Sequence, residues 1–101
     1  MSATAFEISA SEFSHRLKFL RVANGLTQSD LARQAQVSLP SIGKWELGKS
    51  LPSLQYACQL ALVLGCSTDQ LAGLQPIPGY SQFNPRTSHS DILQIHEGGR
   101  S

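Results

Sequence analysis

The sequence predicts a small all-α protein with five short helices between two tails. Three observations indicate this fold. Apolar residues recur at helical spacing between residues 11 and 74, most of these segments follow a Ser or Thr that can cap a helix, and no segment reads as a central strand. A chain of 101 residues with 41% hydrophobic content is enough for one small core. We therefore expect a tail over residues 1–10, one domain over 11–74 and a second tail over 75–101.

The first two predicted helices each have one apolar stripe. In the first, the stripe falls at the spacing i, i+4, i+7 and consists of Phe13, Leu17 and Leu20. Asn24 and Gly25 end that helix. The second runs from Gln28 to Ala35 after the capping-box sequence TQSD, and its inner face consists of Leu31, Ala32 and Ala35.

The next three helices are also bounded by caps. Ser38 caps the third helix, Pro40 suits its first turn, and Ile42 and Trp45 supply its buried side. Ser53 caps the fourth, which ends at Gly65 and has the apolar face Leu54, Ala57, Leu60, Ala61 and Leu64. Ser67 and Gln70 form a capping box for the brief fifth, which carries Leu71 and Leu74.

The residues after Leu74 have a different composition. The stretch QPIPGYSQFNPRTSHSDILQIHEGGRS contains three prolines with several Gly and Ser residues, so helical packing is expected to stop there. Within it DILQIHE, and near the other end AFEIS, alternate apolar and polar residues. Both termini are expected to be flexible, with the alternative that these segments form small strands on each other or on a protein partner.

Several functional classes find little support in the sequence. It has no apolar run of membrane-spanning length and no signal-peptide pattern, so we expect a cytoplasmic protein that does not enter a membrane. Cys58 and Cys66 have no neighbouring His to complete a metal site, and we expect two buried reduced thiols. His15, His89 and His96 are scattered. Neither an enzyme, a cofactor nor a bound metal is therefore expected.

A family resemblance rests on residues 16–74. The matching blocks are the GLTQSDLA opening, the SIGKWELGK segment, the LPSL start of the fourth helix and the LALVLGCSTDQL ending. This stretch resembles the lambda-repressor/Cro-like, or xenobiotic-response-element type, helix-turn-helix family. The resemblance implies a compact five-helix domain whose third helix enters the major groove of double-stranded DNA, generally as a homodimer on a two-fold site.

The resemblance also suggests which residues contact DNA. Gln28, behind its cap Thr27, matches a glutamine that holds a phosphate and braces the third helix, and Lys49 matches a backbone contact. Base contacts would come from the first turn of the third helix, after its cap Ser38, and from one position a turn further along. In this sequence those residues are Leu39, Pro40, Ser41 and Lys44. Only Ser41 and Lys44 can hydrogen-bond through a side chain, while Leu39 can pack on a thymine methyl group. Few side chains are therefore expected to read base edges directly. Gly43 has no side chain, so the helix backbone there can come close to DNA or to a protein partner.

Two further positions match structural features of the family. Arg21 and Glu46 match an ion pair between the first and third helices that fixes the angle of the third. Gln36 stands where glycine is usual, at an expected cost of about 1 kcal/mol if its φ angle is positive.

The sequence thus favours a sequence-selective transcriptional regulator, more specifically a repressor that occupies a two-fold operator. The alternative is an antitoxin or a protein-interaction module that binds a protein through this domain and its tails. The low net charge of the domain, with six Lys and Arg against four Asp and Glu, and the apolar Leu39 and Pro40 support the version of that alternative in which the domain has lost DNA binding. Leu62 is an additional leucine on the expected outer face of the fourth helix. It suggests a two-fold dimer contact over residues 62–74, with the option that Ile92, Leu93 and Ile95 of the tail reinforce it.

Overall fold

The computed structural model describes residues 8–80, which contain five helices and no strand. In chain order they are α1 (Ala10–Ala23), α2 (Gln28–Ala35), α3 (Leu39–Glu46), α4 (Leu54–Leu64) and α5 (Thr68–Ala72). The predicted all-α, five-helix fold is therefore confirmed. The segment DILQIHE and most of AFEIS lie outside the described residues.

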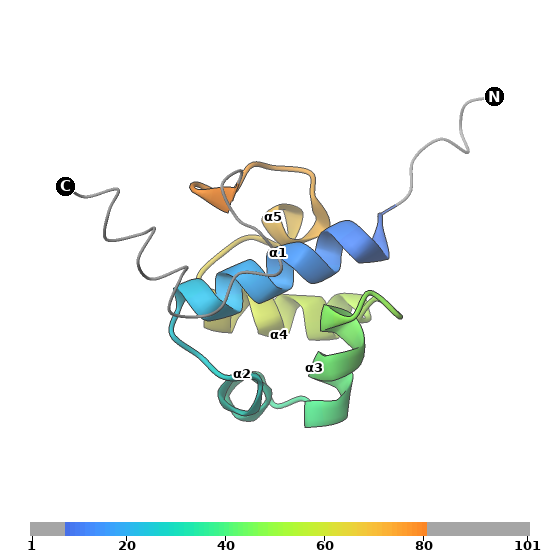
Figure 1. Cartoon of the computed structure of the whole chain (residues 1–101), viewed down its shortest axis with the longest axis vertical. Coiled ribbons are helices and arrows are strands. Elements are labelled where there is room, and N and C mark those ends of the chain that lie inside the picture. Colours follow the sequence, from blue (N-terminus) through green and yellow to red (C-terminus); the bar gives the residue numbers. More distant parts are fainter. Residues whose placement is uncertain (1–7, 81–101) are drawn as a thin grey trace.

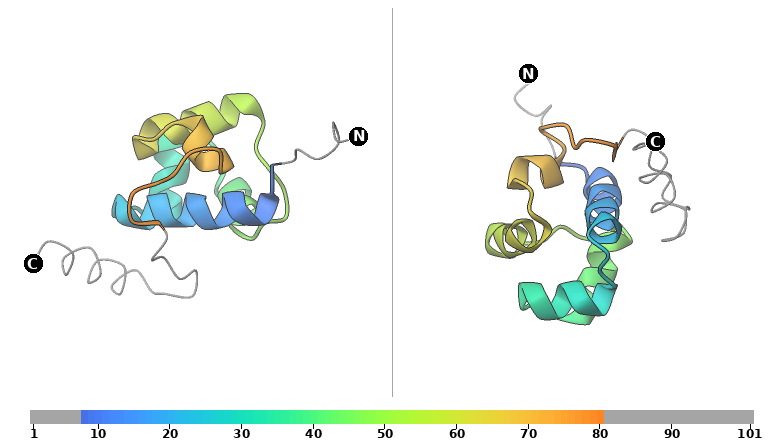
Figure 2. Two further views of the ribbon diagram at one scale, coloured as in Figure 1. Left: turned by 90° about the horizontal axis from the view of Figure 1, so that it is seen from above. Right: turned by 90° about the vertical axis from the view of Figure 1, so that its left-hand side faces the viewer.

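The helices are arranged around α1, which crosses the middle of the molecule (Figure 1). It packs against α3 on one side and against α5 on the other, while α4 contacts both α2 and α5. In Figure 1 and in the right-hand view of Figure 2, α2 lies at the lower end and α5 at the upper end. The α2–α3 pair is therefore separated from α5 by the width of α1 and α4.

Each helix contributes one side chain to the centre of the core. The largest fully buried side chains come one from each of the five helices and are Leu17, Leu31, Ile42, Leu60 and Leu71. Trp45 is 5% exposed and packs in the same cluster, as its inward position in the sequence predicted. Burial of this shared core fixes the helices relative to one another.

The packed part of the chain continues beyond Leu74. Ile77 joins the core, and the Tyr80 ring lies edge-on to Phe19 of α1 with ring centroids 5.6 Å apart. Arg16 connects this extension to α5, because its Nη1 donates to the carbonyl oxygens of Gln70 and Gln75 while its guanidinium lies over the Tyr80 ring. Residues 75–80 thus contain no α-helix, but they are not a free tail, because the buried Ile77 and the contacts of Arg16 hold this proline-rich segment in place.

The expectation of two buried thiols is wrong. Cys58 is exposed on α4, so only Cys66, which is half-buried, approaches the predicted state, and burial raises the pKa of its thiol. Both cysteines are free. The inner face of α4 is occupied by Leu60, Ala61 and Leu64, and Cys58 falls outside it.

Gln36 is the single non-glycine residue of the described chain with a positive φ angle, at 60°. We expect Gln36→Gly to stabilise the protein by about 1 kcal/mol, because glycine adopts the left-handed conformation without a clash at Cβ. Gln34→Gly is the matched control, since Gln34 is exposed inside α2 and glycine there should destabilise by about 1 kcal/mol. Urea unfolding of both variants checks the opposite signs. Equal losses of stability would show that Gln36 is not strained.

Candidate DNA-binding surface

The turn between α2 and α3 consists of Gln36, Val37 and Ser38. Gln36 ends α2 in the left-handed conformation, and the Val37 N–H then donates to the Ala32 carbonyl oxygen at 3.0 Å. Ser38 begins α3 by accepting the Ser41 N–H on its side-chain oxygen. Two eight-residue helices joined by so short a turn, with the small Ala32 buried near the junction, form a helix-turn-helix.

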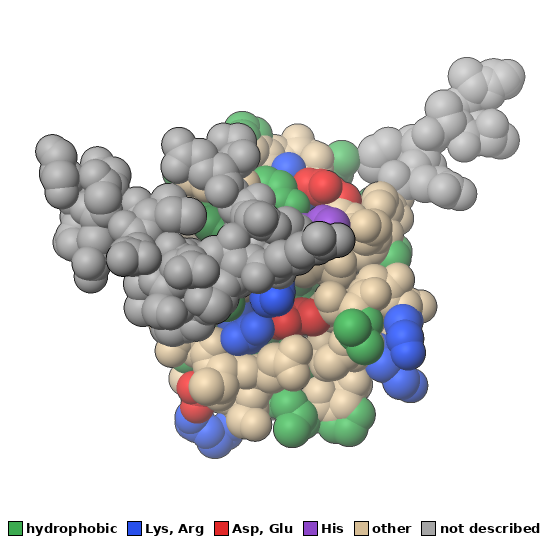
Figure 3. Space-filling model, viewed as in Figure 1, with side chains coloured by type: hydrophobic (Ala, Val, Ile, Leu, Met, Phe, Trp, Pro, Cys, Tyr) green, Lys and Arg blue, Asp and Glu red, His purple; other side chains and the backbone are tan. Residues whose placement is uncertain are grey.

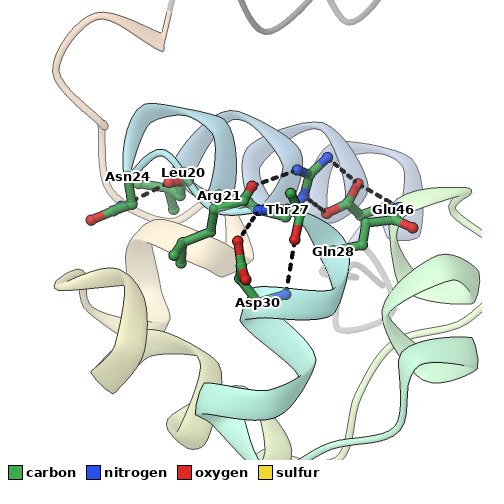
Figure 4. A network of polar contacts seen from close by, with 8 residues as sticks. Leu20, Arg21, Asn24, Thr27, Gln28, Asp30 and Glu46 are labelled. Atoms are coloured by element: carbon green, nitrogen blue, oxygen red, sulfur yellow. Dashed lines mark hydrogen bonds and ion pairs between the residues drawn. The ribbon is translucent and has the colours of Figure 1, made fainter.

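A buried polar network holds α3 against α1 and α2 (Figure 4). The Arg21 guanidinium donates twice to the Glu46 carboxylate, at 2.6 Å from Nε and 3.1 Å from Nη2. Gln28 Nε2 donates to the same carboxylate at 3.1 Å, and Arg21 Nη1 donates to the Leu26 carbonyl oxygen at 2.8 Å. The Arg21 and Glu46 side chains are only 11% and 5% exposed. The network therefore joins three helices and fixes the direction of α3.

The start of α2 is closed by a capping box. The Thr27 side chain accepts the Asp30 N–H, and the Thr27 N–H donates to the Asp30 carboxylate. The hydrogen bond from the Thr27 backbone N–H to the carboxylate is the main reason that the pKa of Asp30 is lowered. The first N–H groups of a helix have no partner within it, so this end of α2 attracts anions.

A shallow hollow lies beside the start of α2 and reaches α3. It is lined by backbone and side chains of the segment from Gly25 to Ser29, together with Arg21 and Leu39. Gln28 thus lies between the hollow and the buried carboxylate of Glu46. This position is compatible with both expected roles of Gln28. Its side chain supports α3 through the hydrogen bond to Glu46, and its backbone lies at the end of α2 that attracts a phosphate.

The outer face of α3 is largely apolar. Leu39 is 45% exposed, Pro40 and Lys44 are exposed, and Leu47, directly after the helix, is 70% exposed. Figure 3 shows hydrophobic side chains on the lower edge of the molecule, below the start of α3. Sequence reasoning missed Leu47, because the sequence does not show whether another element covers the end of α3.

The remaining predicted contact residues lie around this face. The Ser41 hydroxyl is 2.7 Å from the Ser38 hydroxyl, so the two serines are bonded to each other. Lys49 is exposed in the loop after α3, and its N–H donates to the Lys44 carbonyl oxygen at 3.1 Å. The structure therefore brings the predicted residues from Thr27 to Lys44 to the α2–α3 end of the molecule. Lys49 lies in the loop beyond α3, where the neighbouring Gly48 is beside the start of α1, and both Lys44 and Lys49 are exposed.

Within residues 8–80 no three His, Cys, Asp or Glu side chains gather into a group that could hold a metal ion. None of the helices described is both long enough and apolar enough to span a membrane.

Comparisons with known proteins agree with this geometry. A family model for the helix-turn-helix matches residues 17–71. The chain is 37% identical over 87 residues to the HTH-type transcriptional activator BcrR of Enterococcus faecalis, which covers 86% of this chain and 43% of BcrR. It is also 37% identical over 59 residues to the SPbeta prophage-derived HTH-type transcriptional regulator YonR of Bacillus subtilis, covering 58% of this chain and 55% of YonR. The chain thus spans about half the length of these relatives.

One solved structure is also similar. The restriction-modification controller protein C.AhdI from Aeromonas hydrophila aligns with a TM-score of 0.59 and 32% sequence identity, over 61% of this chain and 94% of that one. The family model covers more than half of this chain. The chain belongs to the lambda-repressor/Cro-like helix-turn-helix family.

Proposed function

We propose that this protein is a sequence-selective DNA-binding transcriptional regulator that reads the major groove with α3. The observation that carries the proposal is the position of α3. Its inner side is fixed by the Arg21–Glu46–Gln28 network, while its outer side is exposed next to the anion-attracting start of α2. A rigid helix with a free outer face is what insertion into a groove requires.

The neighbouring groups have complementary roles in this proposal. The start of α2, with Thr27 and Gln28, and the exposed Lys49 would hold the phosphate backbone on either side of α3. Lys44 would reach the acceptor atoms of a guanine. Repression follows most simply, because occupation of an operator blocks other proteins without any further contact.

A selection experiment tests the proposal. The full chain is mixed with a random-sequence duplex pool, and the bound fragments are sequenced after several rounds at about 0.15 M salt, where unspecific binding is weak. We expect one motif to be enriched. Placing that motif over a promoter should lower expression of a reporter gene. If no motif is enriched, the protein is not a sequence-selective DNA reader.

We further propose that the protein acts as a homodimer. One helix with few base-reading side chains gains selectivity when two copies bind half-sites about 34 Å apart. A groove of about 310 Å³ between the α3–α4 loop, α4 and α5 offers the contact, and its exposed leucines are Leu51, Leu54 and Leu74. Leu51 lies in the loop that follows α3, so this groove is connected to the C-terminal end of that helix. Leu62 is 83% exposed as expected, but it does not line this groove.

Two leucine variants test the dimer. Leu54→Glu should give a monomer in sedimentation, because a two-fold contact receives the charge twice. Leu54 is the first residue of α4, where an acidic side chain is tolerated, so the fold should persist. Leu62→Glu is the matched control and should remain dimeric. The opposite pattern would move the contact to Leu62, and a protein that is monomeric even on DNA would contradict the homodimer.

A further inference from the structure

The surface that α3 offers to DNA has an unusual composition. Its exposed side chains at the start and end are apolar, with Leu39 at 45% and Leu47 at 70% exposure, and Pro40 lies between them in sequence. The Ser41 hydroxyl is already bonded to Ser38 at 2.7 Å. Lys44 is therefore the one long polar side chain that α3 itself exposes to form hydrogen bonds with base edges.

Gly43 connects the two leucines along the helix. Positions 39, 43 and 47 are spaced i, i+4 and i+8, so they follow one line on the α3 surface. Apart from its chain neighbours and the backbone of its own helix, a Cβ atom at Gly43 would meet no atom within 4 Å, so packing against other elements gives no reason for a glycine there. The line therefore has a bulky apolar group at each end and open backbone in the middle, which lets the helix approach a groove closely.

The major groove offers only one apolar group for such a surface to contact. Purine and pyrimidine edges present hydrogen-bond donors and acceptors, and thymine adds the methyl group at C5. A leucine pressed against a bare amino or carbonyl edge removes water from it without replacing its hydrogen bonds, which costs free energy. A leucine pressed against a methyl group instead buries two apolar surfaces.

We propose that contacts of Leu39 and Leu47 with pyrimidine C5 methyl groups contribute to the selection of the DNA site by α3. This inference rests on the proposed function and specifies its ligand as duplex DNA with thymines facing α3. Because 5-methylcytosine carries the same methyl group, the protein also distinguishes methylated from unmethylated cytosine at those positions. Leu39, which borders the hollow beside the start of α2, contacts one end of the half-site, and Leu47 contacts the other.

Removal of single methyl groups tests the proposal. In the selected duplex, each thymine is replaced in turn by uracil, which changes the C5 methyl group alone. At contacted positions we expect wild-type affinity to fall about fourfold, the ratio that corresponds to about 0.8 kcal/mol per buried carbon. In Leu39→Ala or Leu47→Ala the uracil effect at the matching position should disappear. Leu62→Ala, an exposed leucine on α4 outside both proposed surfaces, should keep the full uracil effect.

A second arm restores the methyl group. Cytosine placed at a sensitive thymine position should weaken binding, and 5-methylcytosine at the same position should recover about fourfold. Melting curves confirm that the exposed leucine variants remain folded. Selective binding without any uracil effect would overturn this inference and leave the proposed function intact. If no duplex is bound and the leucines of α3 instead contact a protein, both proposals fail.

Discussion

Glu46→Ala should lower the free energy of unfolding by about 3 kcal/mol, because it leaves the Arg21 guanidinium buried with only the Leu26 carbonyl oxygen as a partner. For a chain of this size that loss lowers the melting temperature by more than about 10 °C. Arg21→Ala should cost a similar amount, since the Glu46 carboxylate would retain only the Gln28 amide. Thermal unfolding followed by circular dichroism measures both.

The double variant identifies the cause. Replacing Arg21 by Met and Glu46 by Leu together should recover much of the loss, because no buried charge then lacks its partner. Arg33→Ala is the control for an exposed ion pair: the Arg33 and Asp30 side chains are 71% and 38% exposed, and its removal should cost at most about 0.5 kcal/mol. Strictly additive effects of the Arg21 and Glu46 changes would show that the two residues are not coupled.

Lys44→Ala and Lys49→Ala should affect DNA binding in different ways. Lys44 extends from α3, so its loss should weaken binding to the selected site by about 1–3 kcal/mol and relax the preference at one base pair. Lys49 lies in the following loop, so its loss should weaken all sequences alike and reduce the slope of log K against log salt by about one.

Fluorescence anisotropy at several salt concentrations, with the selected site and a scrambled duplex, separates the two effects. Each variant is the control for the other, because both remove one exposed lysine. Lys44 does not read bases if Lys44→Ala weakens both duplexes equally.

The helices could be predicted because local signals agree with the global fold. The caps Thr27, Ser38, Ser53 and Ser67 all accept the expected N–H groups. The apolar stripes that follow them supply most of the buried core. Leu54 and Leu74, which were predicted for the inner faces of the fourth and fifth helices, are instead 76% and 52% exposed, because Leu54 is the first residue of α4 and Leu74 lies beyond the end of α5. Such signals act over three or four residues, and this is the range in which a sequence is easiest to interpret.

Features that depend on distant contacts were missed or came only from the family resemblance. The contacts of Arg16 with Gln70 and Gln75 span 54 and 59 residues, and no local pattern indicates that they anchor a proline-rich segment. The Arg21–Glu46 pair spans 25 residues and was expected from the resemblance rather than from spacing. Exposure of Leu47 also depends on tertiary packing, because its neighbours in space decide whether the end of α3 is covered.

The ratio of affinities for the selected site and for a scrambled duplex of the same composition tests the central claim most directly. At about 0.15 M salt, selective reading by α3 predicts a ratio of about 10³ or more for the intact protein. Glu46→Ala should lower this ratio at a temperature where the variant is still folded, because α3 is no longer held in position. A ratio near one for the intact protein would contradict the claim that α3 reads DNA sequence.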